Sequence, residues 1–428
     1  MSDYAASEHF CVGLQREAIG RLVCPPLPSP PPRRGEGTRF NPPTQRGEGI
    51  RCNLPTHRGF TPSPLVGEGW GEGQAPAGKP YGSKSTLIRP ALLVAVVLLM
   101  NGCGIGHLWH LAKGQADLLR QRRPVQEALQ DGRLSDAQRD KIRLVLKVRA
   151  FGIEHLGLHD SATYTTFVHL DRPFVSYNLT ASPVDAIQPY VWRYPVVGRM
   201  PYQGFFSKDD ALAAQRELQQ RGYDTYLRGV RAYSTLGYFA DPILSSMLSY
   251  PDGALIETVL HEMLHQTVWI KGHVSFNESL ASFVGQKGAE AYLAHHGGVS
   301  SPASRDYLNR RADAHLLRAH LQQLIARLRE LYQEPVSREE KLRRRETLFD
   351  EAVATWPALF PRMKTHAYRR FFEGRTLNNA LLLSFRVYNR DTAFFDAALA
   401  AHDGDLRRAI AYFKTLRARD LPATFRTP

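Results

Sequence analysis

The chain has 428 residues, and its 55 Lys and Arg outnumber its 41 Asp and Glu, which gives a formal net charge of +14. The basic side chains cluster in segments with helical patterning, interleaved with acidic ones, so we interpret them as solvated helix faces. Attraction to anionic membrane lipid is the alternative interpretation. No segment has the pattern of a nucleic-acid-binding module, and we expect no nucleic-acid partner.

Residues 1–83 are unlike folded protein. They are rich in Pro and Gly, and a degenerate RGEG unit recurs at Arg34 and Arg46. Such a segment cannot bury enough apolar surface to fold, so we expect disorder. It is either a flexible linker or a non-native extension ahead of the true start, and the second interpretation is favoured because a secretory signal follows it.

That signal is predicted at residues 84–103. Basic residues precede an apolar run, 90–100, that is shorter than the ~20 residues of a membrane span. The Gly102-Cys103 junction resembles a bacterial lipobox, which predicts a periplasm-facing lipoprotein held in the bacterial cell envelope by a lipid on Cys103. An uncleaved anchor is the alternative. The exported chain would form no internal disulfide, because the other cysteines lie upstream: Cys11, Cys24 and Cys52.

The first part of the exported chain has helical patterns and then strand patterns. Apolar residues recur at helical spacing from Gly114 to about Leu156, with an N-cap at Ser135. Residues 163–179 alternate and are rich in Tyr, Thr, Phe and Val, as is typical of strands. An amphipathic helix is predicted over 209–221, and a further strand over 226–230.

The most informative feature is the sequence HEMLH, which begins at His261. An apolar-rich helix is predicted over 254–270, with Asp252 as its N-cap. On such a helix His261 and His265 project from one face, one turn apart, so both imidazoles can bind one Zn²⁺. Glu262 is placed to accept a proton from a water bound to that metal.

Glu278 is the candidate third ligand. Gly272 predicts a break, and a second helix is predicted to begin at Glu278 and to run to Val284 or beyond. A helix, a short turn and a helix can return this carboxylate over the two imidazoles, and catalytic zinc sites use three protein ligands with an open fourth position. Two alternatives remain: His273 as a competing ligand, or ordinary histidines and carboxylates on two helices without a metal.

Beyond Gly298 the patterns predict almost only helix. A heptad-like seam of about two heptads favours an antiparallel helical hairpin, with a capping box from Ser337 to Glu340 opening the return helix. Further helices are predicted over 378–386 and 392–416. The seam is formed by Leu317, Leu321, Leu324, Leu328 and Leu331.

Six stretches resemble a bacterial family of predicted zinc aminopeptidases, which are exported lipoproteins. The resemblance extends from about Cys103 to the C-terminus and is most specific between Tyr194 and Val284. It implies an α+β, zincin-like catalytic domain at 104–428, with the metal site at 254–290 and a mostly helical part at 300–428. The stretches are GQADLL at 114–119, YPVVG at 194–198, PYQGFF at 201–206, AYSTLG at 232–237, LHEMLHQ at 260–266 and FNES at 276–279.

The site also resembles the gluzincin plan, in which HExxH supplies two ligands and a downstream Glu the third. That plan often places an Asp four residues after the third ligand, but Ser282 stands here, so another residue must orient the metal-bound histidine. The Gly-x-Met-Glu-Asn strand that anchors the substrate amine in better-known aminopeptidases is absent. Metallopeptidase is therefore the broader expectation and aminopeptidase the narrower one.

We therefore predict a zinc-dependent peptidase acting on a peptide substrate, with Glu262 as general base. Tyr233 and Tyr388 are the candidates to stabilise the oxyanion, and a buried aromatic with a bonded hydroxyl is the alternative for each. The alternatives for the protein are an envelope zinc endopeptidase and a non-catalytic lipid-anchored protein. A structural zinc site would use four protein ligands, usually with Cys, which the exported chain lacks apart from Cys103.

Overall fold

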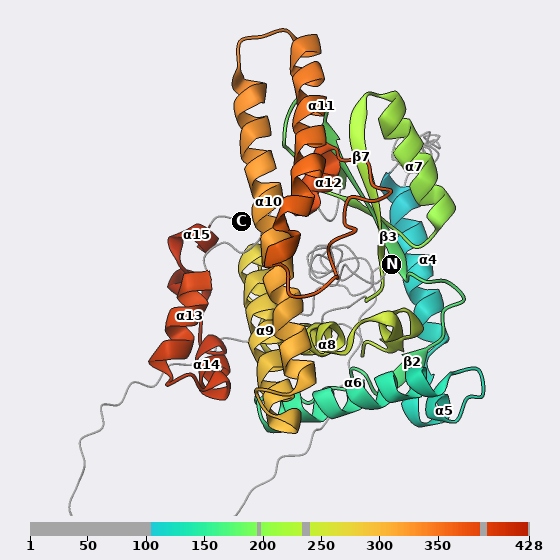
Figure 1. Ribbon diagram of the computed structural model, residues 1–428. Helices are drawn as coiled ribbons and strands as arrows, with labels where there is room; N and C mark the ends of the chain where they lie inside the picture. The colour runs from blue at the N-terminus through green and yellow to red at the C-terminus, as the bar shows by residue number, and fades with distance from the viewer. Residues whose placement is uncertain (1–103, 195–197, 233–239, 386–391, 427–428) are drawn as a thin grey trace, which may run out of the picture. The chain divides into compact units, whose positions relative to one another are not determined.

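The computed structural model describes residues 104–194, 198–232, 240–385 and 392–426 (Figure 1). The predictions made for residues 1–83 and for the signal at 84–103 therefore lie outside the described residues. Within the described part of the chain, no helix combines the length and the apolar character needed to cross a membrane.

Three helices precede the first long strand: α4 (Gly104–Arg120), α5 (Val125–Leu129) and α6 (Asp136–Glu154). The N-cap predicted at Ser135 is confirmed. Its hydroxyl accepts from the backbone N–H of Gln138, whose side chain accepts in return from the N–H of Ser135. This reciprocal pair satisfies two donors that the first turn of α6 cannot pair internally.

The strands form three small sheets. In the first, β1 (Arg123–Pro124) pairs antiparallel with β2 (Thr166–Val168), and β2 pairs parallel with β8 (Ile243–Leu244). A separate hairpin joins β4 (Trp192–Tyr194) to β5 (Gly198–Met200). Strands do occur within 163–179, as predicted, but β2 and the long strand after it are separated by a loop.

The largest sheet has the order β6 (Gln203–Phe205), β3 (Ser176–Pro183) and β7 (Tyr223–Val230), all antiparallel. Helix α7 (Lys208–Gln220), close to the predicted 209–221, packs on one face of this sheet. Because β3 alternates, its apolar residues Tyr177 and Leu179 pack with α7, and its polar residues lie on the opposite face.

After β8, a 3-10 helix η2 (Ser245–Ser249) leads to α8 (Asp252–Thr267) and α9 (Val274–Gly297). Three details of the prediction are wrong. Asp252 is the first residue of α8 and Pro251 its N-cap, and α8 ends at Thr267 rather than at 270. Helix α9 begins at Val274, four residues before Glu278. Its N-cap, His273, makes no capping hydrogen bond through its side chain, so the sequence carries no signal for this start.

The C-terminal part is helical, as predicted. Helices α10 (Pro302–Gln333) and α11 (Arg338–Thr355) form the expected hairpin, followed by η3 (Trp356–Arg362) and α12 (Asn379–Ser384). The single helix predicted over 392–416 is instead α13 (Thr392–Ala401) and α14 (Leu406–Phe413). Asp403 and Gly404, with φ of 58° and 75°, break it, because no helix continues through left-handed backbone. Short segments η4 (Ala418–Asp420) and α15 (Ala423–Arg426) follow.

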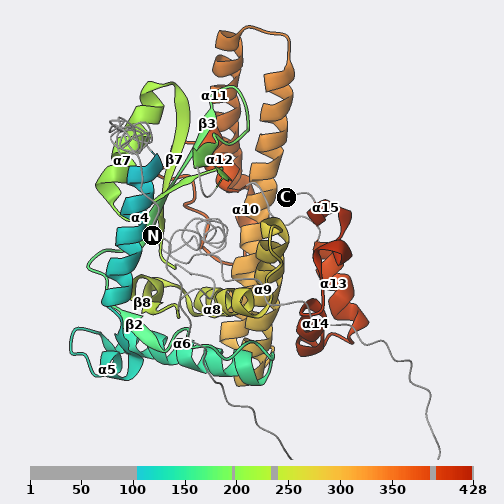
Figure 2. The same cartoon turned by 180° about the vertical axis from the view of Figure 1, so that it is seen from behind.

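Two large hydrophobic cores lie among the helices, and one of them supports the two helices that carry the candidate ligands. The larger core joins α6, α8, α9 and the C-terminal helices, and it contains the apolar residues of α8 that surround the HEMLH sequence. The second core lies within the α10–α11 hairpin, η3 and α12. Figures 1 and 2 show α8 and α9 against α10, with α6 along the other side of α8. The fold is therefore of the predicted α+β class.

Candidate metal centre

Two neighbouring helices bring three metal-ligating side chains together. His261 and His265 come from α8 and Glu278 from α9. The two Nε2 atoms lie 3.1 Å apart, and each lies 3.5 Å from one carboxylate oxygen of Glu278. All three side chains are buried. In the described part of the chain, this is the group of His, Cys, Asp and Glu side chains that could hold a metal ion.

The spacing of these atoms fits a zinc ion. Ligand atoms at about 2.0–2.1 Å from Zn²⁺ in a tetrahedron lie about 3.3–3.4 Å from one another. The three distances between His261, His265 and Glu278, 3.1, 3.5 and 3.5 Å, are close to that edge length. Two imidazoles and one carboxylate are also the donor set of many catalytic zinc sites.

A glycine allows α8 and α9 to approach closely enough for this spacing. Gly285 follows Glu278 by seven residues and so lies on the same face of α9. A Cβ atom there would stand 2.9 Å from the carbonyl oxygen of Glu257 and 3.2 Å from the Cβ of His261. The backbones of the two helices are therefore in contact one turn from the first ligand.

The charges within the cluster stabilise one another. Burial raises the pKa of Glu278, but the two imidazoles outweigh it and lower that pKa to about 2. Burial lowers the pKa of His261, but its hydrogen bond to Glu278 and the charge of Glu262 outweigh it, so the net shift is upward. Glu278 is therefore a carboxylate throughout the physiological range, as a metal ligand must be.

Glu262 lies beside the ligands on α8, and its side chain is buried. Tyr164, which sequence patterns did not single out, lies near it. Burial raises the pKa of Tyr164 well above its usual value, and the negative charges of Glu262 and Asp241 raise it further. Its phenol therefore remains protonated and can donate a hydrogen bond next to the proposed base.

The backbone at Tyr164 is unusual. Its φ is +64°, in the left-handed region that bulky residues rarely adopt. Contacts on both sides hold it there: its N–H donates to the carbonyl of Asp241 at 2.7 Å, and Gln266, one turn after Glu262, donates to the hydroxyl of Thr163 at 2.6 Å. No local pattern reveals this, because the contact joins residues about 100 positions apart.

The other residues predicted for the site are placed differently. Tyr233 and Tyr388 lie outside the described residues. His273, the alternative ligand, is not part of the cluster, and its Nδ1 lies 2.9 Å from the carbonyl oxygen of Phe425. Ser282 is half-buried on α9.

A polar network braces α8 from outside the cluster, and it too was missed by the sequence patterns. The Tyr307 hydroxyl, on α10, donates to Glu257 at 2.6 Å. Arg311 donates to Tyr307 at 3.3 Å and to Gln286 of α9 at 2.7 Å. Because Glu257 precedes His261 by one turn, α10 holds both metal-ligand helices in register.

Comparison with known proteins gives one match. A family model described as Putative aminopeptidase matches residues 106–426. No curated protein and no solved structure matches the chain.

Proposed function

Because this chain belongs to the family described as Putative aminopeptidase, we propose that it is a zinc-dependent aminopeptidase that removes residues from the amino end of peptides. The observation that carries the metal assignment is the buried set of His261, His265 and Glu278 at distances that suit a tetrahedral ion. A structural zinc site would use four protein ligands, whereas three converge among the described residues. One coordination position is then left for chemistry.

The roles of the residues follow from their positions. When bound, Zn²⁺ supplies Lewis acidity to the attacking water and to the scissile carbonyl. Glu262, next to a ligand and buried, accepts the proton of the attacking water and passes it to the leaving amine. Tyr164 stays protonated near Glu262, where its hydroxyl is available as a proton donor. The burial of the ligands strengthens each of these electrostatic interactions.

The test is a digest of a synthetic peptide library by the zinc-loaded protein, read by mass spectrometry. Successive loss of amino-terminal residues is the expected result. Cuts at internal bonds would instead favour the endopeptidase alternative, and an intact library would favour the non-catalytic one.

The Glu262→Gln variant tests the mechanism separately. It should bind one equivalent of zinc like the parent and lose about 100- to 10,000-fold in turnover, the usual contribution of a general base. Glu330→Gln, an exposed change on α10, is the matched control and should leave both properties unchanged. A Glu262→Gln protein that cleaves peptides like the parent would exclude this residue as the base.

We also propose the envelope location expected from the lipobox, with the lipid on Cys103. The support is the sequence alone, because residues 84–103 lie outside the described residues. Expression of the Cys103→Ser variant in a bacterium tests it. The parent should be recovered with membranes and should incorporate labelled palmitate, and the variant should not incorporate it.

A further inference from the structure

Three exposed histidines gather where α6 and α9 end. His155 is the C-cap of α6, and His295 and His296 lie in the last turn of α9, which ends at Gly297. All three side chains are exposed to solvent. The two helices end side by side (Figures 1 and 2), and the rings of His155 and His295 are in contact there. Residues 140 positions apart in the sequence thus form one imidazole cluster on the surface.

The three imidazole rings are held against one buried phenyl ring. The ring centres of His155 and His295 lie 4.6 Å apart, and those of His295 and His296 lie 5.0 Å apart. The ring of Phe151 contacts all three, at 4.9, 5.5 and 6.0 Å between ring centres. Because Phe151 belongs to the large core, the imidazoles share a fixed support although they face solvent.

These separations suit imidazoles that share a metal ion. An imidazole that binds Zn²⁺ at about 2.0–2.1 Å has its ring centre about 3 Å from the ion, so two of them in a tetrahedral site have ring centres about 5 Å apart. His261 and His265 in the candidate metal centre have ring centres 4.7 Å apart. The pair of His155 and His295 has nearly the same spacing.

The cluster offers two ligands rather than three. Among the described residues, the group whose three ligand atoms lie mutually close is that of the buried centre on α8 and α9. His296 stands next to the pair as a further imidazole. Its Nδ1 lies 3.0 Å from the carbonyl oxygen of Tyr292 and must donate to it, because a carbonyl only accepts. The neutral ring therefore keeps its lone pair on Nε2, as metal-binding histidines usually do.

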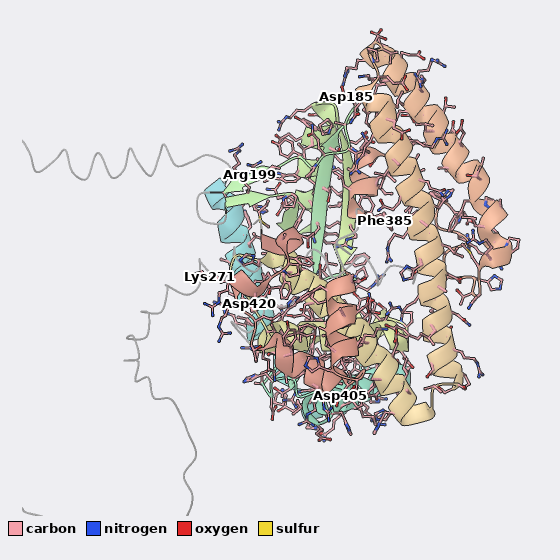
Figure 3. The ribbon with its side chains drawn as sticks, turned by 90° about the vertical axis from the view of Figure 1, so that its left-hand side faces the viewer. Asp185, Arg199, Lys271, Phe385, Asp405 and Asp420 are labelled. Carbon is pink, nitrogen blue, oxygen red and sulfur yellow. The ribbon has the colours of Figure 1, made fainter. Side chains whose placement is uncertain are left out.

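The ends of the two helices also favour a cation. Carbonyl groups in the last turn of a helix carry partial negative charge, and α6 and α9 end at the same place. One cation already uses this charge. Arg407 of α14, the helix whose N-cap Asp405 is labelled in Figure 3, donates to the carbonyl of Glu154 at 2.7 Å. Its contact is to the backbone of α6 and leaves the imidazoles exposed to solvent.

We propose that His155 and His295 bind a divalent transition-metal ion, with His296 as an adjacent third imidazole and water in the remaining positions. Imidazole nitrogen suits Zn²⁺, Cu²⁺ and Ni²⁺, whereas Mg²⁺ and Ca²⁺ prefer oxygen. His295 follows Glu278 by 17 residues, about 25 Å along α9. This site is therefore separate from the buried centre, and it does not depend on the proposed peptidase function.

Calorimetric titration of the zinc-loaded protein with zinc chloride tests the proposal, because the buried centre is then already filled. One further equivalent of zinc should bind, and magnesium chloride should give no binding. His155→Ala and His295→Ala should each weaken this second equivalent at least about 10-fold, since even the loss of a residue that only orients a ligand has such an effect. His366→Ala removes an exposed histidine elsewhere and should leave the binding unchanged.

Retention on an immobilised-nickel resin gives a second readout that reports only exposed imidazoles. His261 and His265 are buried and cannot reach the resin. The untagged parent and His366→Ala should be retained, and the protein with both His155→Ala and His295→Ala should pass through. Both changes affect exposed side chains, so the melting temperature of this double variant should stay close to that of the parent.

Two results would overturn the proposal. The first is a zinc-loaded parent that binds no further equivalent of zinc, which needs no variant. The second is an unchanged second equivalent in the double variant, which would place that ion elsewhere on the surface. A second equivalent that is lost in the double variant, together with an uncut peptide library, would support this site and contradict the peptidase function.

Discussion

Asn277 and Ile270 form a closed pair of hydrogen bonds across the loop between α8 and α9. The N–H of Ile270 donates to Oδ1 of Asn277 at 2.9 Å, and Nδ2 of Asn277 donates to the carbonyl of Ile270 at 2.9 Å. The amide side chain thus pairs with both the N–H and the carbonyl of Ile270, as a residue on a neighbouring strand would. Because Glu278 is the next residue, this pair sets where the third ligand stands relative to α8.

We expect Asn277→Ala to weaken zinc binding by about 10- to 100-fold, the usual effect of losing a residue that orients a ligand. The variant should also lose about 1–3 kcal/mol of stability, because the buried N–H of Ile270 loses its partner, while the carbonyl of Ile270 keeps the N–H of His273. A competition assay with a zinc-binding dye and a thermal melt measure the two effects. Asn309→Ala, a half-buried change on α10, is the control. Unchanged zinc affinity would show that the hydrogen bonds between Asn277 and Ile270 are not needed to position Glu278.

Gly285→Ala tests the close approach of α8 and α9. Alanine is the better helix former by about 1 kcal/mol, so an open position would gain stability. Here we expect a net loss, because the added methyl meets the backbone of Glu257 and overpacking costs about 1–3 kcal/mol. Chemical denaturation measures whether the free energy of unfolding falls or rises in the variant. Zinc affinity should fall together with stability. Lys287→Ala, at a half-exposed position of α9, is the matched control, and a stabilised Gly285→Ala protein would contradict the argument.

Tyr164→Phe tests the phenol beside Glu262. The ring remains in the core and only the hydroxyl is lost, so we expect a small change in melting temperature and unchanged zinc content. If the phenol assists Glu262 during the reaction, turnover should fall by about 10- to 100-fold with little change in KM, because the lost hydroxyl acts on the base rather than on substrate binding. Steady-state kinetics with a chromogenic peptide distinguish an effect on turnover, seen in kcat, from an effect on substrate binding, seen in KM. A large loss of stability at unchanged kcat would assign Tyr164 to packing alone.

His107 predicts a pH dependence of stability. Burial against Phe205 and the charge of His110 lower its pKa from 6.5 to about 4. The folded state therefore favours the neutral ring, and its full stability is present above pH 6.5. It is lost as the pH falls toward 4, by up to ~3 kcal/mol. Thermal melts with chelator present, which removes the contribution of the metal, should show this loss.

The His107→Phe variant should lose less stability than the parent over the same pH range. The exposed His110→Gln should also reduce the loss slightly, since one of the charges that lower the pKa of His107 is removed. Equal acid sensitivity of His107→Phe and the parent would place the effect elsewhere in the protein.

The part of the candidate site that follows helical periodicity could be predicted. His261 and His265 lie four residues apart on one helix, and the short loop to Glu278 limits where that carboxylate can reach. The helical hairpin of α10 and α11 was predictable for the same reason, because its leucine seam repeats locally. In each case the relevant residues are neighbours in the sequence.

The remaining features depend on tertiary contacts. Tyr164 lies in a loop about 100 residues before Glu262, whose charge raises its pKa, and the role of Gly285 depends on a second helix backbone. Neither relationship leaves a local pattern. The break at Asp403 and Gly404 is different, because Asp-Gly is a turn signal that the surrounding apolar periodicity outweighed in our interpretation of 392–416.

The short distance along the chain between His261 and Glu278 also bears on how the protein folds. All three candidate ligands belong to one helical hairpin, and its contacts close a short loop, which costs little chain entropy. The brace from Tyr307 and Arg311 comes from a helix formed by later residues. Under the proposed function, an ion could therefore bind the α8–α9 hairpin before α10 packs against it, and the metal would then act as an early nucleus for the folding of the helices around it.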